Sequence, residues 1–534
     1  MPPLGPFTTA LAPRGMVVAV DRLAAEAGVA ALRAGGTVAD AAVAASAVLA
    51  VTTPHMCGMG GDLFAVVTRP GAAPEVLNAS GRAGSGADAD RFRAEVGTVM
   101  PFREDIRLVT VPGCVDGWLA LHERHGRLPL ADVLADALGY ATDGFPASAL
   151  LAAKAPDVIG RPGEHDLTAA ARLAPLAAGD RVRRPGVARS LHAIVADGRA
   201  GFYEGDFGRG LVELGAGEYT PEDLARVQAD WVEPVRLRVW GHDLWGPPPN
   251  SQAYLTLASA WMAERVGLPG GPEGPDDPRW AHLLVEATRQ AGHDRLDALH
   301  EHADGDALLD PDRLALRADA IDPDAAGDLP APATAGGTIF LAVADAEGNG
   351  VALIQSNAAG FGSHLVEPST GIFLHNRGCG FSLVPGHPAE YGPGRRPPHT
   401  LAPIVVTRPD DGALHAIVGT MGGDSQPQVV LQLLARLLAT GEDPATAVAA
   451  GRWVLGSRRD PTFDVWQDPS SIRVRVEGHA PAAWAAGLAD RGHPVEPMDD
   501  FDYRAGHAHV IVRHDDHLAG AADPRAPGSA VAAW

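Results

Sequence analysis

The sequence is nearly without lysine, and it is short of positive charge as a whole. Lys154 is the only lysine among 534 residues. The chain has 43 Lys and Arg residues against 66 Asp and Glu residues, which gives a formal net charge of −23. Nucleic acids and anionic membrane surfaces bind to basic patches. The charge balance therefore favours small molecules as partners, and any Schiff-base chemistry would have to use Lys154.

Cysteine and long apolar runs are also scarce. The three cysteines, Cys57, Cys114 and Cys379, form no Cys-x-x-Cys pair, so we expect neither a disulfide framework nor a zinc site. No run of about 18 apolar residues predicts a membrane span, and residues 1–14 lack the apolar core of a secretion signal. We expect a cytoplasmic protein without a cofactor. The segment His514–His517 could suggest a metal site, but a polar turn explains it better.

What the sequence does contain is typical of a globular chain with mixed helices and strands. Hydrophobic residues make up 46% and charged residues 20% of the sequence, and 63 Gly and 45 Pro residues interrupt it. Helical segments and short apolar β-branched segments alternate between these breaks. The clearest predicted helices are Arg22–Ala34, Thr37–Val51 and Ala253–Val266, and the clearest predicted strands are Leu63–Thr68, Ile404–Thr407 and Ala416–Val418.

The segment Thr334–Asn357 predicts a buried β-hairpin. Two apolar runs, Thr338–Ala344 and Val351–Ile354, flank a turn of Asp, Glu, Gly and Asn residues. The first run does not alternate with polar residues, which is typical of a strand that is covered on both faces. The Gly pair that precedes Thr338 places this residue at the start of the hairpin.

Thr338 allows two interpretations. It can simply open a strand after a glycine turn, which the pattern alone favours. Alternatively, its hydroxyl attacks the carbonyl of Gly337, the chain is cut between the two residues, and the freed α-amine becomes the base for that hydroxyl. The preceding segment Ile321–Gly337 is rich in Pro, Ala, Asp and Gly, and we expect a flexible lead in which a cut breaks no element.

Three loops contain further candidate residues. The Gly58–Gly61 loop lacks the spacing of a phosphate-binding loop, so a tight buried turn is the better interpretation. Arg82 lies in a predicted loop, where it is either solvated or available to a substrate carboxylate. Gly422 and Gly423 lie between a predicted strand and a predicted helix, where they could form an oxyanion hole or a packing turn.

Taken in order, these segments resemble the gamma-glutamyltransferase family of N-terminal-nucleophile hydrolases over nearly the whole chain. The resemblance implies an α/β (α+β) fold, a four-layer αββα sandwich. It implies self-cleavage into a large subunit, residues 1–337, and a small subunit, residues 338–534, which stay together as one intertwined domain and could dimerise further. The residues that carry the resemblance are Glu26–Gly28, Thr37–Ala42, Gly58–Gly61, Val111–Gly113, Thr338, Asp345–Asn349, Gly371–Ile372, Arg396–Pro397, Gly422–Gly423 and Ala522–Arg525.

The resemblance also implies roles for single residues. Thr338 would be the nucleophile, Ser356 the hydroxyl that orients it, and the N–H groups of Gly422 and Gly423 the oxyanion hole. The positions that hold the glutamyl ammonium in the family match Ala358, Arg377 and Gly380, so an acidic partner is missing and an arginine is present. The resulting candidates for substrate binding are Arg82, Asn357, Arg377, His399, Thr400 and Asp424.

These departures favour a ligand with a carboxylate and without an ammonium group, although ordinary structural pairing could equally explain Arg377 and His399. Blocks such as LHNRG, PHTL and MGGDSQPQ are most similar to the branch that includes oxamate amidohydrolase. We therefore expect an autoprocessing amidohydrolase that acts on a small anionic amide, with water or an amine as acceptor. The alternatives are a gamma-glutamyl transferase or hydrolase that acts on glutathione-like amides and an unprocessed binding protein. The role of His364 stays open.

Overall fold

The computed structural model describes residues 7–159, 167, 175–271, 274–327, 337–456 and 472–534. For Gly337 and Thr338 it describes the backbone alone. Most of the predicted flexible lead, residues 328–336, lies outside the described residues.

Two seven-stranded sheets form the centre of the molecule, and all the strand pairs within them are antiparallel. The first, which we call the hairpin sheet, has the order β21 (Ala530–Ala533), β2 (Gly15–Ala19), β10 (Gly337–Asp345), β11 (Gly350–Ala358), β3 (Asp62–Thr68), β4 (Glu75–Ala79) and β7 (Asp230–Val232). The second, the opposing sheet, has the order β1 (Ala10–Ala12), β20 (Leu518–Ala522), β19 (Ala508–Arg513), β15 (Leu414–Thr420), β14 (Ile404–Thr407), β9 (His242–Gly246) and β8 (Val235–Val239). Both sheets therefore combine strands from before and after Thr338.

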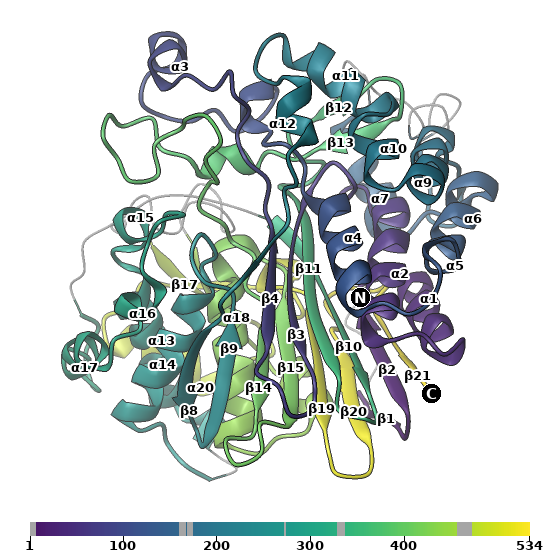
Figure 1. Ribbon diagram of the computed structural model, residues 1–534. Coiled ribbons are helices and arrows are strands. Elements are labelled where there is room, and N and C mark those ends of the chain that lie inside the picture. The colour runs from purple at the N-terminus through teal and green to yellow at the C-terminus, as the bar shows by residue number, and fades with distance from the viewer. Residues whose placement is uncertain (1–6, 160–166, 168–174, 272–273, 328–336, 457–471) are drawn as a thin grey trace.

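Helices cover the outer face of each sheet, which gives the expected four-layer αββα sandwich (Figure 1). The outer face of the hairpin sheet packs against α1 (Arg22–Arg33), α2 (Val38–Thr52), α4 (Cys114–His125), α6 (Ala135–Asp143) and α9 (Pro185–Asp197). The opposing sheet packs against α13 (Ala253–Val266), α14 (Pro278–Gly292), α17 (Pro311–Asp319), α18 (Gln426–Leu434), α19 (Pro444–Ala449) and α20 (Ala482–Asp490). The predicted fold is confirmed.

Smaller elements complete the chain. A three-stranded sheet consists of β16 (Trp453–Gly456), β17 (Arg473–Glu477) and β18 (Val495–Met498). The remaining short strands and helices are β5 (Phe145–Pro146), β6 (Arg181–Val182), β12 (Leu365–Glu367), β13 (Ile372–Leu374), α3 (Ala89–Val96), α5 (Leu130–Val133), α7 (Ala149–Lys154), α10 (Arg199–Tyr203), α11 (Asp206–Gly215), α12 (Pro221–Ala225), α15 (Arg295–Ala298) and α16 (Gly305–Leu308).

The two sheets meet in a dry apolar layer. Phe340 of β10 and Ile354 of β11 pack there against Val405, Ile417 and Ile511 of the opposing sheet. The hairpin is thus buried on both faces, as its unbroken apolar run predicts. The helix layer over the hairpin sheet is also buried: α2 is rich in alanine, and all its residues are buried.

Several strands follow no sequence signal. β4 ends at Ala79, three residues before Arg82, so the predicted loop that contains Arg82 begins only after this strand. The strands β20 and β21 consist mostly of Ala and Gly, which have low β propensity, so their neighbours in the sheets determine their conformation. His514–His517 forms the turn between β19 and β20, as expected.

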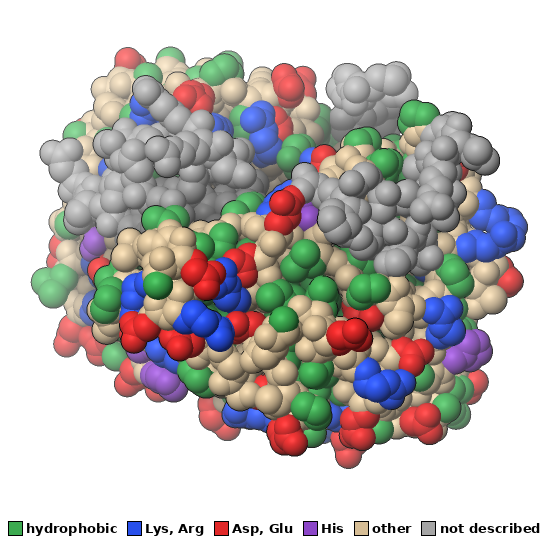
Figure 2. Space-filling view, turned by 90° about the horizontal axis from the view of Figure 1, so that it is seen from above, with side chains coloured by type: hydrophobic (Ala, Val, Ile, Leu, Met, Phe, Trp, Pro, Cys, Tyr) green, Lys and Arg blue, Asp and Glu red, His purple; other side chains and the backbone are tan. Residues whose placement is uncertain are grey.

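The surface and the helices of the described part add two observations. On the face in Figure 2, acidic and basic side chains are interspersed. In the described ranges, no helix has the length and apolar character that a membrane crossing needs, and no group of three or more His, Cys, Asp or Glu side chains is arranged to hold a metal ion.

The contact between Gly419 and Phe340 yields a test of the sheet packing. A Cβ atom added to Gly419 would lie 2.5 Å from two ring carbons of Phe340. We expect Gly419→Ala to destabilise the protein by about 1–3 kcal/mol, because one buried layer must shift. Gly139 in α6 has no atom within 4 Å of such a Cβ, so Gly139→Ala should instead stabilise by about 0.5–1 kcal/mol. Denaturant unfolding of both variants measures the difference, and equal stabilities would contradict the packing argument.

Candidate active site

The start of β10 brings Thr338 opposite Ser356 and Asn357. In the ladder, Gly337 pairs with Ala358 and Ile339 pairs with Gln355, with a shift in register between the two pairs. One residue on β10 therefore faces two residues on β11, which is the geometry of a β-bulge. Bulges commonly occur beside active sites, where they redirect side chains. The backbone thus places the predicted nucleophile and the predicted orienting serine side by side, while the Thr338 side chain lies outside what the structure describes.

Ser356 and Asn357 are buried against the glycine loop. The Ser356 hydroxyl oxygen accepts a hydrogen bond from the backbone N–H of Ala358 at 2.8 Å. The Asn357 amide donates to the carbonyl oxygen of Pro54 at 3.1 Å, and its own Oδ1 has no hydrogen-bond partner. A Cβ atom on Gly61 would lie 2.2 Å from the Ser356 carbonyl oxygen. The glycine loop is therefore a tight buried turn, as predicted, and it needs glycine because β11 lies so close.

Asp62 joins the predicted residues, although no role was predicted for it. It is the first residue of β3, directly opposite Ser356 in the ladder. Its Oδ2 accepts hydrogen bonds from Arg377 Nε and from His399 Nε2, each at 2.8 Å. All three side chains are buried. Asp62 thus connects two of the expected substrate-binding residues to the strand that carries Ser356.

The electrostatics of this cluster determine its protonation. Burial alone would raise the pKa of the Asp62 carboxyl, but Arg377 and His399 outweigh that effect and hold the pKa well below its usual range. Burial, together with the charge of Arg377, lowers the pKa of His399 to about 4. His399 Nδ1 accepts a hydrogen bond from the backbone N–H of Leu401 at 3.2 Å. His399 is therefore neutral at pH 7, and its one ring proton lies on Nε2, towards Asp62.

Two polar atoms of the cluster are left without partners. Arg377 Nη1 donates to the Thr400 hydroxyl at 2.9 Å, whereas Arg377 Nη2 and Asp62 Oδ1 are buried and have no hydrogen-bond partner. The first is a donor and the second is an acceptor. A ligand that offers both an oxygen and an N–H group, as an amide does, would satisfy both atoms.

Gln252 connects this cluster to the glycine turn at the end of β15. Its Nε2 donates to the carbonyl oxygens of Thr400 and Gly423, each at 2.9 Å. Its Oε1 accepts from Arg295 Nε at 3.0 Å, and Arg295 also lies 3.5 Å from the Asp424 carboxylate. Asp424 is thus adjacent to the glycine turn but is paired with an arginine. Neither Gln252 nor Arg295 was singled out in the sequence, because neither lies in a motif.

The glycine turn itself offers backbone donors. Gly422 has φ 138° and Gly423 has φ 60°, conformations that favour glycine. Ser425 fixes the turn by donating from its hydroxyl to the Gly422 carbonyl oxygen at 2.7 Å. In the hydrogen bonds of the described residues, neither the N–H of Gly422 nor that of Gly423 has an acceptor. Two free N–H groups at the start of α18 could stabilise an oxyanion.

Two further candidates lie apart from this cluster. Arg82 forms an ion pair with Asp230, which it shares with Arg396. In the described residues, no hydrogen bond or ion pair links the Arg82 side chain to Arg377 or His399. His364 contacts the guanidinium of Arg103. The structure therefore brings together all the predicted side chains and turns except Arg82, with Thr338 placed by its backbone only.

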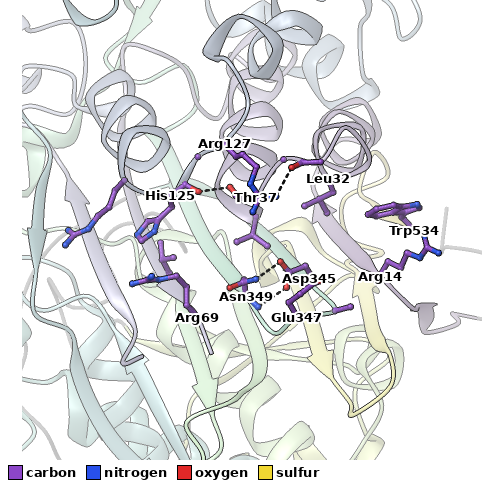
Figure 3. Close-up of a pocket in the computed structure, with 17 residues that line it drawn as sticks. Arg14, Leu32, Thr37, Arg69, His125, Arg127, Asp345, Glu347, Asn349 and Trp534 are labelled. Carbon is purple, nitrogen blue, oxygen red and sulfur yellow. Dashed lines mark hydrogen bonds between the residues drawn. The ribbon is translucent and has the colours of Figure 1, made fainter. Parts of the chain in front are cut away.

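A separate cleft of about 780 Å³ lies at the other end of the hairpin. Figure 3 shows Thr37, Arg127 and His125 on one side of it, with Asp345 and Asn349 of the hairpin turn facing them. It includes none of the residues predicted for catalysis or substrate binding.

Comparison with known proteins finds relatives that match nearly the full length of this chain. The family model described as gamma-glutamyltranspeptidase matches residues 24–533. An oxamate amidohydrolase proenzyme from Klebsiella pneumoniae is 36% identical over 97% of this chain and 98% of its own length. The glutathione hydrolase-like YwrD proenzyme from Bacillus subtilis shows the same identity and the same coverage. The crystal structure of a cephalosporin acylase from Bacillus halodurans, 31% identical, superposes with a TM-score of 0.89 over 100% of this chain and 98% of the acylase chain.

The buried Asp62 carboxylate yields a stability prediction. Asp62→Asn leaves the Arg377 charge buried without its anion, so we expect a loss of about 3–5 kcal/mol in the free energy of unfolding. Because the folded-state pKa of Asp62 is depressed, its contribution is present above the ordinary carboxyl range and is lost as the pH falls through the folded-state pKa. The destabilisation relative to wild type should therefore be constant between about pH 6 and 8 and shrink in acid.

A surface pair provides the control for this measurement. Glu26 and Arg22 form an exposed pair on α1, and Glu26→Gln should cost at most about 0.5 kcal/mol. Guanidinium unfolding at several pH values compares the two variants. Similar losses in both would show that Asp62 is not a buried counter-ion.

Proposed function

The chain belongs to the gamma-glutamyltranspeptidase family of N-terminal-nucleophile hydrolases, and from this premise we propose that it is a self-cleaving proenzyme whose mature form hydrolyses a small anionic amide through Thr338. The two parts, residues 1–337 and 338–534, would remain associated after the cut. The fold supports this association, because each central sheet contains strands from both parts. No cofactor is needed for the reaction.

The observation that carries the proposal is a continuous path of contacts around the start of β10. It leads from the Thr338 backbone to Ser356 across the ladder, from Ser356 to Asp62 in the next strand, and from Asp62 to Arg377. Thr400 and Gln252 continue it to the glycine turn at Gly423. These contacts support the proposal that Thr338 as nucleophile, Arg377 as substrate-binding donor and the two glycine N–H groups as oxyanion donors would act on one bound substrate, as acyl transfer requires.

Self-cleavage and catalysis would use the same hydroxyl. In the precursor, the Thr338 hydroxyl attacks the Gly337 carbonyl carbon, and the peptide C–N bond breaks, which frees the Thr338 amine and leaves Gly337 as an ester on the Thr338 oxygen. Water then hydrolyses this ester, which releases the Gly337 carboxylate and restores the Thr338 hydroxyl. In the mature enzyme this amine takes the hydroxyl proton while the oxygen attacks the substrate carbonyl. The N–H groups of Gly422 and Gly423 would stabilise the oxyanion. The amine product leaves with a proton, and water then releases the carboxylic acid from Thr338.

The free donor and acceptor of the Asp62–Arg377 pair support an oxamate-like substrate. Arg377 Nη2 would donate to a substrate carboxylate or carbonyl oxygen, and Asp62 Oδ1 would accept from the amide N–H. His399 and Thr400 hold these two groups in place, while Asn357 Oδ1 offers another acceptor beside Ser356. Asp62 already compensates the charge of Arg377. The site would therefore bind the substrate anion mainly through a directed N–H group of Arg377, and less through net positive charge.

A gamma-glutamyl substrate is the second candidate. The name of the Bacillus subtilis relative, a glutathione hydrolase-like proenzyme, favours it. Against it, Ala358 and Gly380 occupy positions where a side chain would have to hold the glutamyl ammonium. Gly380 lies near the Pro398 carbonyl, so a Cβ atom there would be 2.6 Å from that oxygen.

Self-cleavage yields the first prediction for this function. The purified wild-type chain should give two fragments that meet between Gly337 and Thr338 in denaturing mass spectrometry, because the Thr338 hydroxyl performs the cut. Thr338→Ala should remain a single chain. An intact wild-type chain after long incubation would contradict both the nucleophile and the hydrolase proposal.

Substrate preference yields the second prediction for this function. The mature enzyme should release ammonia from oxamate with a kcat/KM at least about tenfold above that for a gamma-glutamyl anilide, equivalent to roughly 1.4 kcal/mol of transition-state discrimination. The processed protein is assayed with both compounds, and Thr338→Ala serves as the background. Preference for the anilide would favour the gamma-glutamyl alternative.

A further inference from the structure

Three buried histidines that the catalytic scheme does not use lie around the candidate site. His55, His507 and His509 are at most 3% exposed, and none of their ring nitrogens has a hydrogen-bond partner. A buried polar group without a partner costs about 1–3 kcal/mol. Six such atoms on segments that border the candidate site point to another molecule as their partner.

Two of these histidines lie at the start of β19, next to the glycine turn: His509 is within the strand, and His507 directly precedes it. The His507 carbonyl oxygen accepts a hydrogen bond from the N–H of Met421, the residue before Gly422. His509 is opposite Gly419 in the ladder between β19 and β15. Its ring stacks on Phe340, two residues after Thr338, with 6.3 Å between the ring centroids.

His55 approaches from the hairpin sheet. Its carbonyl oxygen accepts from the N–H of Phe361 at 3.1 Å, and the carbonyl of the following residue, Met56, accepts from the N–H of Asn357 at 2.9 Å. The three histidines are therefore attached to the segments that border Thr338: Asn357 on one sheet, and Met421 and Phe340 at the junction with the other. The contacts that connect Arg377 with Thr338 are different, because they run through Asp62 and Ser356.

The charged groups around the histidines leave a small positive balance. On the opposing side, Asp523 pairs with Arg452 at 2.8 Å and with Arg525 at 3.2 Å, and Arg525 also pairs with Glu477. These two cations and two anions compensate one another. Lys154 lies 5.6 Å from the ring of Tyr503, whose ring is 6.5 Å from that of His507. The lone lysine of the chain thus adds a positive charge on this side.

The empty histidines are neutral. Burial lowers the pKa of His55 to about 3, that of His507 to about 4 and that of His509 to about 3. His507 and Lys154 lower the pKa of His55 further. Arg452 and Arg525 lower that of His507 further, while Asp523 acts in the opposite direction. An anion placed between the rings would favour their protonated form.

We propose that His55 and His507, with His509 beside them, form a second anion subsite that takes up a proton when it binds a substrate carboxylate. The proposal rests on the amide-hydrolase function and names its substrate class: amides that carry one carboxylate on each side of the scissile bond. Arg377 would hold one carboxylate, and the histidines would hold the other. The bond that breaks is still the amide C–N bond.

The proton uptake gives the affinity a defined pH dependence. Ligand binding raises the histidine pKa, so binding is tightest at low pH, weakens as the pH rises from the pKa of the free histidine to that of the complex, and levels off above the pKa of the complex. When one proton is taken up, the Kd rises up to about tenfold per pH unit.

Calorimetric titration of the full protein with glutarate tests the subsite without any turnover. Glutarate has two carboxylates separated by three carbon atoms, the same span as in an N-oxalyl amino acid, and has no amide bond to hydrolyse. Titrations at pH 6.5, 7.25 and 8.0, in two buffers with different ionisation enthalpies, give the number of protons taken up. We expect the uptake with glutarate to be largest at pH 6.5 and to fall towards pH 8.0, because a nearby carboxylate raises a histidine pKa by about 1–3 units. We expect no uptake with butyrate, its one-carboxylate counterpart.

Variants assign the proton to the histidines. His55→Gln and His507→Gln should each reduce the uptake by at least half and weaken glutarate binding at pH 6.5 by about fivefold or more. His514→Gln, in the exposed turn after β19, is the matched control and should bind as the wild type does. Thermal unfolding shows whether each variant folds. If only one of the two histidine variants folds, that variant alone decides the test.

Three results would overturn the subsite: no glutarate binding at pH 6.5, binding without proton uptake, or unchanged uptake in a folded His55→Gln or His507→Gln variant. Failure of the amide-hydrolase function would look different, since it would appear as an uncut chain or as no hydrolysis of any amide, whatever the titrations show.

Discussion

The candidate site depends on one buried carboxylate. Asp62 begins β3 beside Ser356, and its side chain holds both Arg377 and His399. Removing an arginine from water costs several kcal/mol unless an anion compensates it, so Arg377 can be buried here only because Asp62 is present. Such a pair contributes little net stability compared with apolar side chains. The pair matters for geometry instead, because it fixes the guanidinium of Arg377 while Nη2 has no hydrogen-bond partner.

The hairpin gives this pair a rigid support. β10 and β11 lie in the middle of one sheet and are covered by the other. Ser356 pairs with Asp62 of β3, and β10 pairs with β11 on both sides of Thr338, at Gly337 and from Ile339 onward. Gln355 strengthens the same region from the helix layer, where its amide exchanges hydrogen bonds with Ser46 of α2. A cut before Thr338 would fall at the end of a strand whose remaining length stays paired with β2 and β11.

The sequence predicted most of the architecture because the signals for it are local. The predicted helices Thr37–Val51 and Ala253–Val266 appear within one residue of their expected bounds, and the hairpin around the turn at Asp345 appears as expected. The strands β20 and β21 were missed because Ala and Gly give no periodic signal. Asp62 was missed for a different reason: its partners Arg377 and His399 lie 315 and 337 positions away. Contacts of that range become visible only once the sheets are paired.

The charge state of the whole site then limits what it can bind. Asp62 compensates Arg377, Asp523 and Glu477 compensate Arg452 and Arg525, and the histidines are neutral when empty. A site of this kind does not need to keep an excess of buried charge in the absence of substrate, which would be costly at low dielectric. The positive charge for a second carboxylate would come from a proton that enters with it. Selectivity for anions would then arise from coupling between binding and protonation, in addition to the directed N–H group of Arg377.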